Sequence, residues 1–222
     1  MDKSAVVALA GVVTSGAVAG VQRVELAQTR LEHTINDFGD TTSLDIDVTG
    51  DGVEDLTFEI FQGESGGLNE AWLSGIDFTR NGGFLTSFDD NDNGVFQEFN
   101  AGDTLGPANE DDIGFETRTY AQYDLDDFGS LISGGSLAGR TAYIGFGLFD
   151  AEPLPGGGTN EGNRYGYMLV EFGPLRAIDL DNPAYIEILE VGIGGINAEF
   201  RIPAPGGALA MAALGLVARR RR

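Results

Sequence analysis

Carboxylate and hydroxyl side chains recur at ligand-like spacing in one short run, DVTGDGVEDL at residues 47–56. Counted from the first Asp, side-chain oxygens fall at positions 1, 3, 5 and 9, and position 7 offers a backbone carbonyl. A hard cation such as Ca²⁺ prefers a shell of about six to eight oxygen atoms from such groups. The spacing therefore predicts a structural calcium site formed by Asp47, Thr49, Asp51, Asp55 and the carbonyl of Val53.

The same run has a second interpretation, as a turn that uses Asp and Gly only for their backbone preferences. Gly52 permits a sharp change of chain direction in either case. Two positions depart from the EF-hand pattern, because Thr49 stands where Asn or Asp is usual and Phe58 stands at position 12 in place of Glu. Both interpretations, calcium site and bare turn, stay open at this stage.

Other acidic runs are less site-like. Residues 89–94 read DDNDNG, and we expect a solvated hairpin loop there because Asn100 falls where a calcium loop needs a carboxylate. Residues 109–112, NEDD, predict plain surface charge. Paired carboxylates could also serve a secreted glycoside hydrolase, but among 35 Asp and Glu residues some pair will have a suitable separation by chance. No flanking motif singles one pair out, so hydrolysis is the second alternative.

Aromatic side chains supply the first alternative function, a carbohydrate-binding module. Trp72 and the six tyrosines could stack on sugar rings. In a β domain of this size, however, most such rings pack in the core or on a sheet face. A planar strip of exposed rings would distinguish the two roles.

The composition excludes several function classes. The formal net charge of −22 produces a surface that repels nucleic acid and anionic lipid and attracts divalent cations. The chain has no cysteine, and His33 is its single histidine, which excludes cysteine nucleophiles and thiolate or multi-histidine metal sites. We therefore expect a protein that is not an enzyme and that binds no nucleic acid.

The central part of the chain predicts an all-β domain. Short apolar stretches alternate with many of the 34 glycines, and no long amphipathic helix is evident. Strands are expected at 56–60, 113–123, 141–149, 165–172 and 184–191, with 141–149 paired to 165–172 across the loop 151–163 and with 196–202 closing the sheet. Regular short strands at this spacing predict two antiparallel sheets packed as a jelly-roll-like β-sandwich over residues 20–201.

Both ends of the chain have the composition of membrane-directed segments. Lys3 precedes an uncharged Ala, Val and Gly run, and Ala17-Val18-Ala19 matches a cleavage pattern, so residues 1–19 predict a helical signal peptide. Residues 202–222 contain a Pro motif, an apolar run at 206–218 and four terminal arginines. This order predicts a hydrophobic helix that enters the inner membrane with the arginines on the cytoplasmic side.

Three segments resemble known sequence families. The tail, with Pro203-Ala204-Pro205 where Pro-Glu-Pro is usual, resembles the PEP-CTERM sorting signal of Gram-negative bacteria. YIGF at 143–146 and YGY at 165–167 are similar to the "GF…YGW" strand pair of uncharacterised β-sandwich ectodomains of that group. The run 47–56 resembles the DxNGDGxxDL loops of secreted repeat and dockerin-like proteins.

These resemblances imply an exported protein of the cell envelope or extracellular matrix. Its tail would be held transiently in the inner membrane and processed by an exosortase-type sorting enzyme, and its β domain would be associated with extracellular polysaccharide. Together with the calcium-like loop, they predict a non-enzymatic, calcium-stabilised surface protein.

Overall fold

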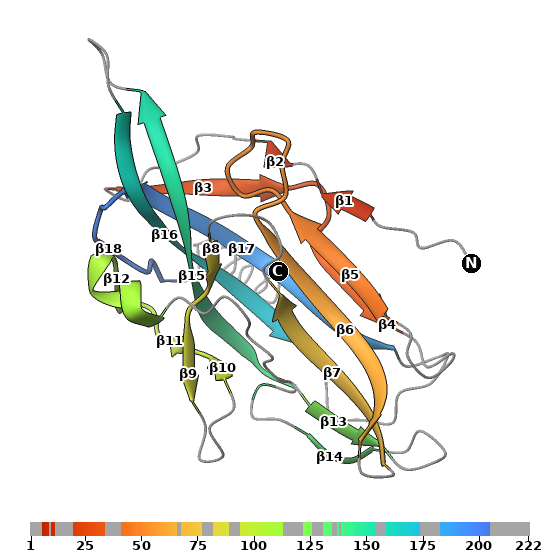
Figure 1. Cartoon of the computed structure of the whole chain (residues 1–222). Helices are drawn as coiled ribbons and strands as arrows, with labels where there is room; N and C mark the ends of the chain where they lie inside the picture. Colours follow the sequence, from red (N-terminus) through yellow and green to blue (C-terminus); the bar gives the residue numbers. More distant parts are fainter. Residues whose placement is uncertain are drawn as a thin grey trace, which may run out of the picture.

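The computed structural model describes residues 6–8, 10–11, 20–33, 41–65, 68–76, 82–88, 94–112, 122–125, 131–134, 137, 139–153, 159–173 and 183–204. These residues form an all-β protein (Figure 1). Their one helical element is a 3₁₀ segment, η1 (Pro107–Asp112). Every strand pair is antiparallel except that of β1 with β5, which is parallel.

Two larger sheets contain most of the strands. The six-stranded sheet has the order β1 (Val6–Ala8), β5 (Thr41–Ile46), β6 (Leu56–Ser65), β7 (Leu68–Ile76), β13 (Gln122–Leu125) and β14 (Leu131–Gly134). The eight-stranded sheet runs through β11 (Glu98–Phe99), β15 (Thr141–Pro153), β16 (Thr159–Phe172), β17 (Ala184–Ile196), β3 (Val21–Leu26) and β2 (Ala10–Gly11), with β4 (Arg30–His33) on β17 and β8 (Gly82–Phe84) on β15. Two small pairs are β9 (Thr86–Phe88) with β10 (Gly94–Phe96), and β12 (Thr104–Leu105) with β18 (Phe200–Arg201).

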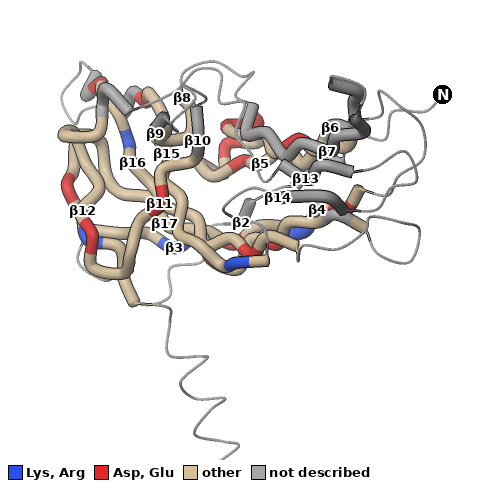
Figure 2. The backbone as a smooth tube through the Cα atoms, turned by 90° about the horizontal axis from the view of Figure 1, so that it is seen from below, with Lys and Arg blue, Asp and Glu red and all other residues tan. Residues whose placement is uncertain are grey.

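The main core is shared by the two larger sheets, which lie on opposite sides of it (Figure 2). Alternating apolar residues from both sheets enter this one buried cluster, among them Ile46 and Phe58 from the first sheet and Ile144, Met168 and Ile188 from the second. Side chains alternate between faces along a strand, so this pattern leaves one face of each sheet for the core. His33 on β4 adds a polar link, because its Nδ1 lies 2.9 Å from Oγ1 of Thr42 on β5.

A second buried cluster covers the opposite face of the eight-stranded sheet. It consists of Val21, Leu85, Leu105, Tyr143, Tyr165, Tyr167, Leu169, Phe200 and Ile202, and we call it the outer cluster. Its strand residues alternate with those of the main core, as with Tyr143 beside Ile144 and Tyr167 beside Met168. The outer cluster therefore fixes β12 and β18 against the sheet.

The predicted hairpin of β15 and β16 is confirmed, with Tyr143 opposite Leu169 and Phe146 opposite Gly166. The strands are longer than expected and remain paired as far as Pro153 and Thr159. The expected strand at 196–202 is reduced to Phe200–Arg201, and it pairs with β12 instead of closing a large sheet. Asn197 explains this change, because its φ of 53° turns the chain after β17.

The two terminal segments lie largely outside the described residues. In the expected signal peptide, the described residues form the short strands β1 and β2, paired with β5 and β3, and no helix. Of the expected strand at 113–123, residues 122–123 form the start of β13, and residues 113–121 lie outside the described part of the chain, as does the tail from residue 205 onward. Within that part, no helix is both long and apolar enough to cross a membrane.

Candidate metal centre

The loop at residues 47–55 joins β5 to β6 at one end of the six-stranded sheet. Ile46 and Leu56 form the last strand pair, and the Asp55 amide donates to the Ile46 carbonyl at 2.8 Å. Ile46, Val48 and Leu56 are buried in the main core, so the base of the loop is fixed by packing. The loop itself turns through Gly50 and Gly52, whose φ values of 79° and 86° favour glycine.

Asp47 is the centre around which the loop folds. It is 1% exposed, and both of its carboxylate oxygens accept hydrogen bonds from the loop. The amide of Gly50 donates to Oδ1 at 2.6 Å, that of Gly52 donates to Oδ2 at 2.8 Å, and the Thr49 hydroxyl donates to Oδ1 at 3.3 Å. Backbone amides thus stabilise a buried negative charge in place of a basic side chain.

Asp55 lies against the same part of the loop. Its Oδ2 accepts the amides of Val48 at 2.8 Å and Thr49 at 2.9 Å. Burial, with a smaller contribution from the charge of Asp47, raises the pKa of Asp55 to about 6, against the lowering effect of the Thr49 and Val48 hydrogen bonds. Two carboxylates are therefore held close enough to repel one another, which is the electrostatic arrangement that a cation would relieve.

Asp51 and Val53 lie on the exposed side of the loop. Asp51 Oδ1 accepts the Val53 amide at 2.8 Å, and the Val53 side chain is 43% exposed. The structure therefore brings Asp47, Thr49 and Asp55 together by direct contacts and leaves Asp51 turned to its own neighbour. Among the described residues, no group of three or more His, Cys, Asp or Glu side chains is placed to hold a metal ion.

The residues nevertheless suit calcium in kind. Every candidate ligand is an oxygen atom, as a hard cation requires. An ionised carboxylate has about four acceptor positions, and the three contacts to Asp47 and two to Asp55 leave positions in reserve. Coordination by the full predicted set would require the Asp51 carboxylate to turn towards Asp47.

A second carboxylate pair, which the sequence did not single out, lies on the outer face of the same sheet. The Thr57 hydroxyl donates to Asp45 Oδ1 at 2.8 Å, and Glu59 follows two residues later on β6. Burial raises the pKa of Glu59, and the charge of Asp45 adds to this effect. Side chains alternate between the two faces of a strand, and Leu44 and Phe58 face the core. The same alternation in the sequence predicts that Asp45 and Glu59 share the opposite face.

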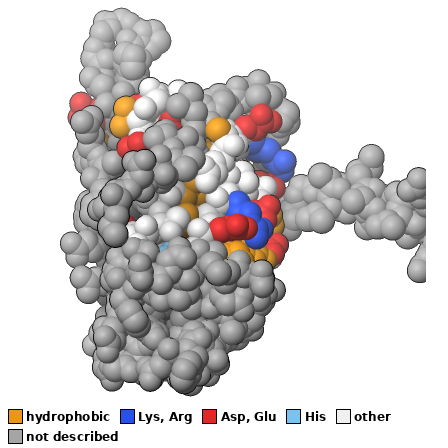
Figure 3. All heavy atoms as spheres, turned by 90° about the vertical axis from the view of Figure 1, so that its right-hand side faces the viewer, with side chains coloured by type: hydrophobic (Ala, Val, Ile, Leu, Met, Phe, Trp, Pro, Cys, Tyr) orange, Lys and Arg blue, Asp and Glu red, His pale blue; other side chains and the backbone are white. Residues whose placement is uncertain are grey.

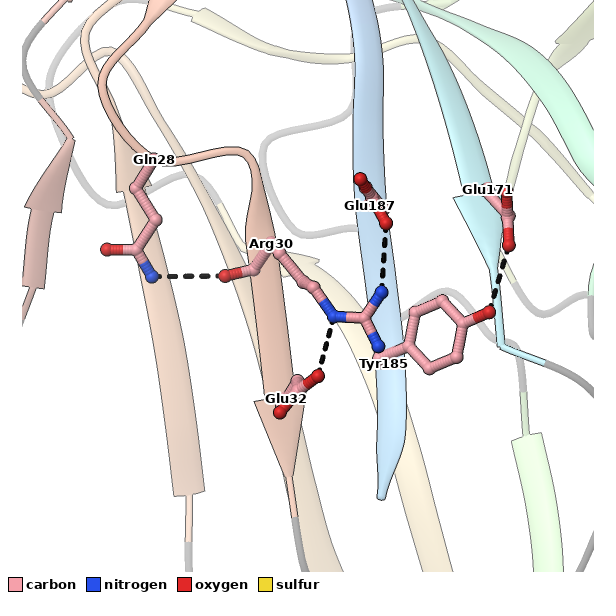
Figure 4. Close-up of polar contacts among 6 residues, drawn as sticks. All are labelled: Gln28, Arg30, Glu32, Glu171, Tyr185 and Glu187. Atoms are coloured by element: carbon pink, nitrogen blue, oxygen red, sulfur yellow. Dashed lines mark hydrogen bonds and ion pairs between the residues drawn. The ribbon is translucent and has the colours of Figure 1, made fainter. Parts of the chain in front are cut away.

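The aromatic side chains bear on the carbohydrate alternative. Tyr143, Tyr165 and Tyr167 are buried in the outer cluster and do not form an exposed strip. Tyr185 is partly exposed, but the Arg30 guanidinium lies 3.9 Å from its ring centroid (Figure 4). Trp72 lies on β7, in a part of that strand for which side-chain burial is not described.

Arg30 organises the polar surface around this tyrosine. Its Nε and Nη1 contact Glu32 at 2.6 Å and Glu187 at 2.9 Å, and the Tyr185 hydroxyl donates to Glu171 at 2.9 Å (Figure 4). Acidic and basic side chains lie next to each other on the face drawn in Figure 3. These contacts join β4, β17 and β16, and they account for Tyr185 as a packing residue of the sheet surface.

Of the two other acidic runs, only the one at residues 109–112 lies in the described part of the chain. The run at 89–93 lies outside the described residues. Asn109 has a structural role, because its side-chain Oδ1 accepts the Gly106 backbone amide at 3.2 Å and its backbone amide donates to the Gly106 carbonyl at 2.9 Å. These two bonds begin the 3₁₀ segment η1.

Comparisons with known proteins find no counterpart: no family model, no curated protein and no solved structure matches the chain. A function for this chain is therefore inferred from its own residues. Within the described part, the 47–55 loop is where buried charge, glycine-dependent turns and oxygen ligands coincide.

Proposed function

We propose that this chain is an exported, non-enzymatic protein of the cell envelope or extracellular matrix, whose β domain is stabilised by one Ca²⁺ ion in the 47–55 loop. One observation carries the calcium part of this proposal, and the sequences of the two termini carry the export part. Asp47 is 1% exposed and, among its described contacts, is stabilised by donors of its own loop while a second carboxylate, Asp55, lies nearby. A divalent cation would bind both charges and fix the β5–β6 connection.

Thermal melts with calcium and with chelator test the metal site. Ligand at about 100 times its Kd adds about 2.7 kcal/mol to the free energy of unfolding, which is roughly 5–10 °C in Tm for a domain of this size. Asp51→Ala should remove most of this gain while the chelated protein stays folded, since the described contact of Asp51 is a local one with Val53.

A matched control is Asp103→Ala, which alters another turn aspartate. Asp103 Oδ2 accepts the Asn100 amide at 2.7 Å, but Asp103 belongs to a loop without the calcium-like spacing. This variant should keep the full calcium response. Equal melting temperatures of the wild type in calcium and in chelator would show that the 47–55 loop is only a turn.

Two further observations support the finer fold and the export topology. A core shared by two antiparallel sheets supports a jelly-roll-like β-sandwich as the arrangement of the domain. Val21, near the start of the domain, and Phe200 and Ile202, near its end, belong to the same outer cluster. A helical signal peptide and a C-terminal hydrophobic helix at 206–218 could thus reach one membrane while the domain lies on one side of it.

The proposed partners follow from the sequence of the tail. They are an exosortase-type sorting enzyme that acts on residues 202–222 and an extracellular polysaccharide in the surrounding matrix. Mass spectrometry of the terminal peptides from the native host tests this part. We expect a mature N-terminus at Gly20 and loss of Arg222; retention of Arg222 on most envelope copies would instead show a permanent anchor.

A further inference from the structure

The last described residues of the chain are part of the folded domain. Phe200 and Ile202 are 4% and 1% exposed and pack in the outer cluster. Arg201, between them, pairs with Thr104 on β12. Pro203 is partly buried, and Ala204 is exposed. We call residues 200–203 the latch, since they hold the end of the domain against β12 and the sheet (Figure 1).

Backbone hydrogen bonds extend the latch beyond its strand. The Ile202 amide donates to the Asp103 carbonyl at 2.9 Å, and the Gly102 amide donates to the Ile202 carbonyl at 2.8 Å. Gly102 has a φ of 96°, so the turn that presents this amide depends on glycine. Both polar groups of Ile202 are therefore bound in addition to its side chain.

One contact involves the peptide bond that leads out of the domain. The Tyr143 hydroxyl donates to the Pro203 carbonyl at 3.2 Å, and this carbonyl belongs to the Pro203–Ala204 bond. Tyr143 is itself fixed, with its ring packed edge-on against Tyr167 at a centroid distance of 5.7 Å. A protease or transpeptidase must take the carbonyl of the bond it attacks into its own oxyanion-binding site. Tyr143 and an enzyme therefore compete for the same oxygen.

We propose that the latch controls access to the Pro203–Ala204 bond, which lies in the Pro motif of the sequence, so that an enzyme can act on this bond only after the latch has opened locally. The inference rests on the proposed function for the meaning of this motif, but the protection itself is a property of the fold. When the latch is closed, the folded domain extends as far as Pro203, and no linker separates it from the Pro203–Ala204 bond. When the latch opens, Ile202 leaves the outer cluster, and the segment around Pro203 becomes available to an enzyme as an extended substrate.

A proline-specific endoprotease that accepts folded proteins measures this protection directly. The purified full chain and a synthetic peptide of residues 196–210 are digested in parallel, and products ending at Pro203 are quantified by mass spectrometry. We expect the product to form at least tenfold more slowly from the full chain than from the peptide. Equal rates would overturn the proposal.

Two variants test the mechanism. Tyr143→Phe keeps the ring and removes the hydroxyl, and it should accelerate cleavage at Pro203 roughly fivefold, as expected for one hydrogen bond in a local opening equilibrium. Ile202→Ala should accelerate it further. Tyr185→Phe is the matched control, because it removes a tyrosine hydroxyl bound to Glu171 instead of the latch, and its rate should equal that of the wild type.

The possible outcomes distinguish this proposal from the proposal that a sorting enzyme processes the tail. If Tyr143→Phe and the wild type are cleaved at Pro203 at equal rates, the proposal that the latch protects this bond is wrong, whatever happens to the tail in the host. If protection holds but Arg222 persists on envelope copies, the latch stands and the sorting proposal fails. Circular dichroism of each variant confirms that the measured change is local and that the β domain remains folded.

Discussion

Asp47 and Asp55 show how one pair of side chains can serve either a turn or a metal. In the described loop both accept amides of their own segment, which is ordinary turn chemistry. What exceeds turn chemistry is the burial of two neighbouring carboxylates: burial, with a smaller contribution from the charge of Asp47, raises the pKa of Asp55 to about 6. At pH 7, above this pKa, Asp55 is mostly ionised, so a bound cation would neutralise the charge that a proton neutralises at lower pH.

The raised pKa leads to a pH-dependent prediction. A folded-state pKa near 6, above the ordinary 3.8, means that Asp55 binds its proton more tightly in the folded chain than in the unfolded chain. Without metal, its contribution to stability is present below about pH 4 and is lost as the pH rises through 6. In chelator, Asp55→Asn should therefore melt at a higher temperature than the wild type at pH 7, and the difference should shrink by pH 5.

Calcium should reverse this comparison. At pH 7 with saturating calcium, the wild type should melt at the higher temperature, because Asn lacks the ligand charge. The other carboxylates are common to both proteins, so the difference between the two melting curves isolates Asp55. Melting temperatures that differ by a constant amount from pH 5 to pH 7 in chelator would contradict the assignment of the raised pKa to this group.

At the scale of elements, the glycines of the long strands explain the YIGF and YGY motifs. Gly145 pairs with Tyr167 and Phe146 pairs with Gly166 across β15 and β16. A methyl group on Gly166 would meet the Phe146 ring, and one on Gly192 would meet Tyr167 Cε1 at 2.5 Å. Gly166 in the YGY motif and Gly192 in β17 therefore have a packing function, because each leaves room for an aromatic ring from the neighbouring strand.

Substitutions in β17 test this packing role. Gly192→Ala should lower the free energy of unfolding by about 1–3 kcal/mol, because the added methyl group displaces the buried Tyr167 ring. Gly195→Ala in the same strand should be tolerated, since its nearest contact would be the Ala198 side chain at 3.7 Å. Urea unfolding compares the two variants, and equal losses would attribute the effect to glycine content alone.

The elements also show what could be predicted from the sequence. The β15–β16 hairpin was predictable because its apolar residues run continuously and its partner is the next strand. β3 and β4 were not predicted, since their mixed sequences, such as Val21–Leu26, become strands by pairing with β17 about 160 residues away. The spacing of the oxygen-bearing residues indicates where the loop lies. It does not predict the burial of Asp47, because this burial depends on how Ile46 and Leu56 pack in the main core.

At the scale of the whole molecule, the sequence and the structure place the end of the β domain differently. Ile202 begins a Pro-containing apolar segment, and the sequence alone places it in the membrane-directed tail. In the folded chain it lies in the outer cluster with Val21 and Phe200. The same residue is apolar in either environment, so composition alone could not distinguish a core position from a membrane position.

Truncation measures how much this end contributes to the whole. A fragment of residues 20–204 retains the latch, and a fragment of residues 20–201 lacks Ile202 and the Tyr143–Pro203 hydrogen bond. Burial of an Ile side chain contributes about 1.5–3 kcal/mol, so the shorter fragment should unfold at a correspondingly lower urea concentration. Both should give strand-dominated circular dichroism, because the main core lies within residues 24–193. Ile202→Ala in the longer fragment should account for most of the loss. Equal unfolding midpoints for the two fragments would mean that residues 202–204 contribute nothing to the domain and belong functionally to the tail.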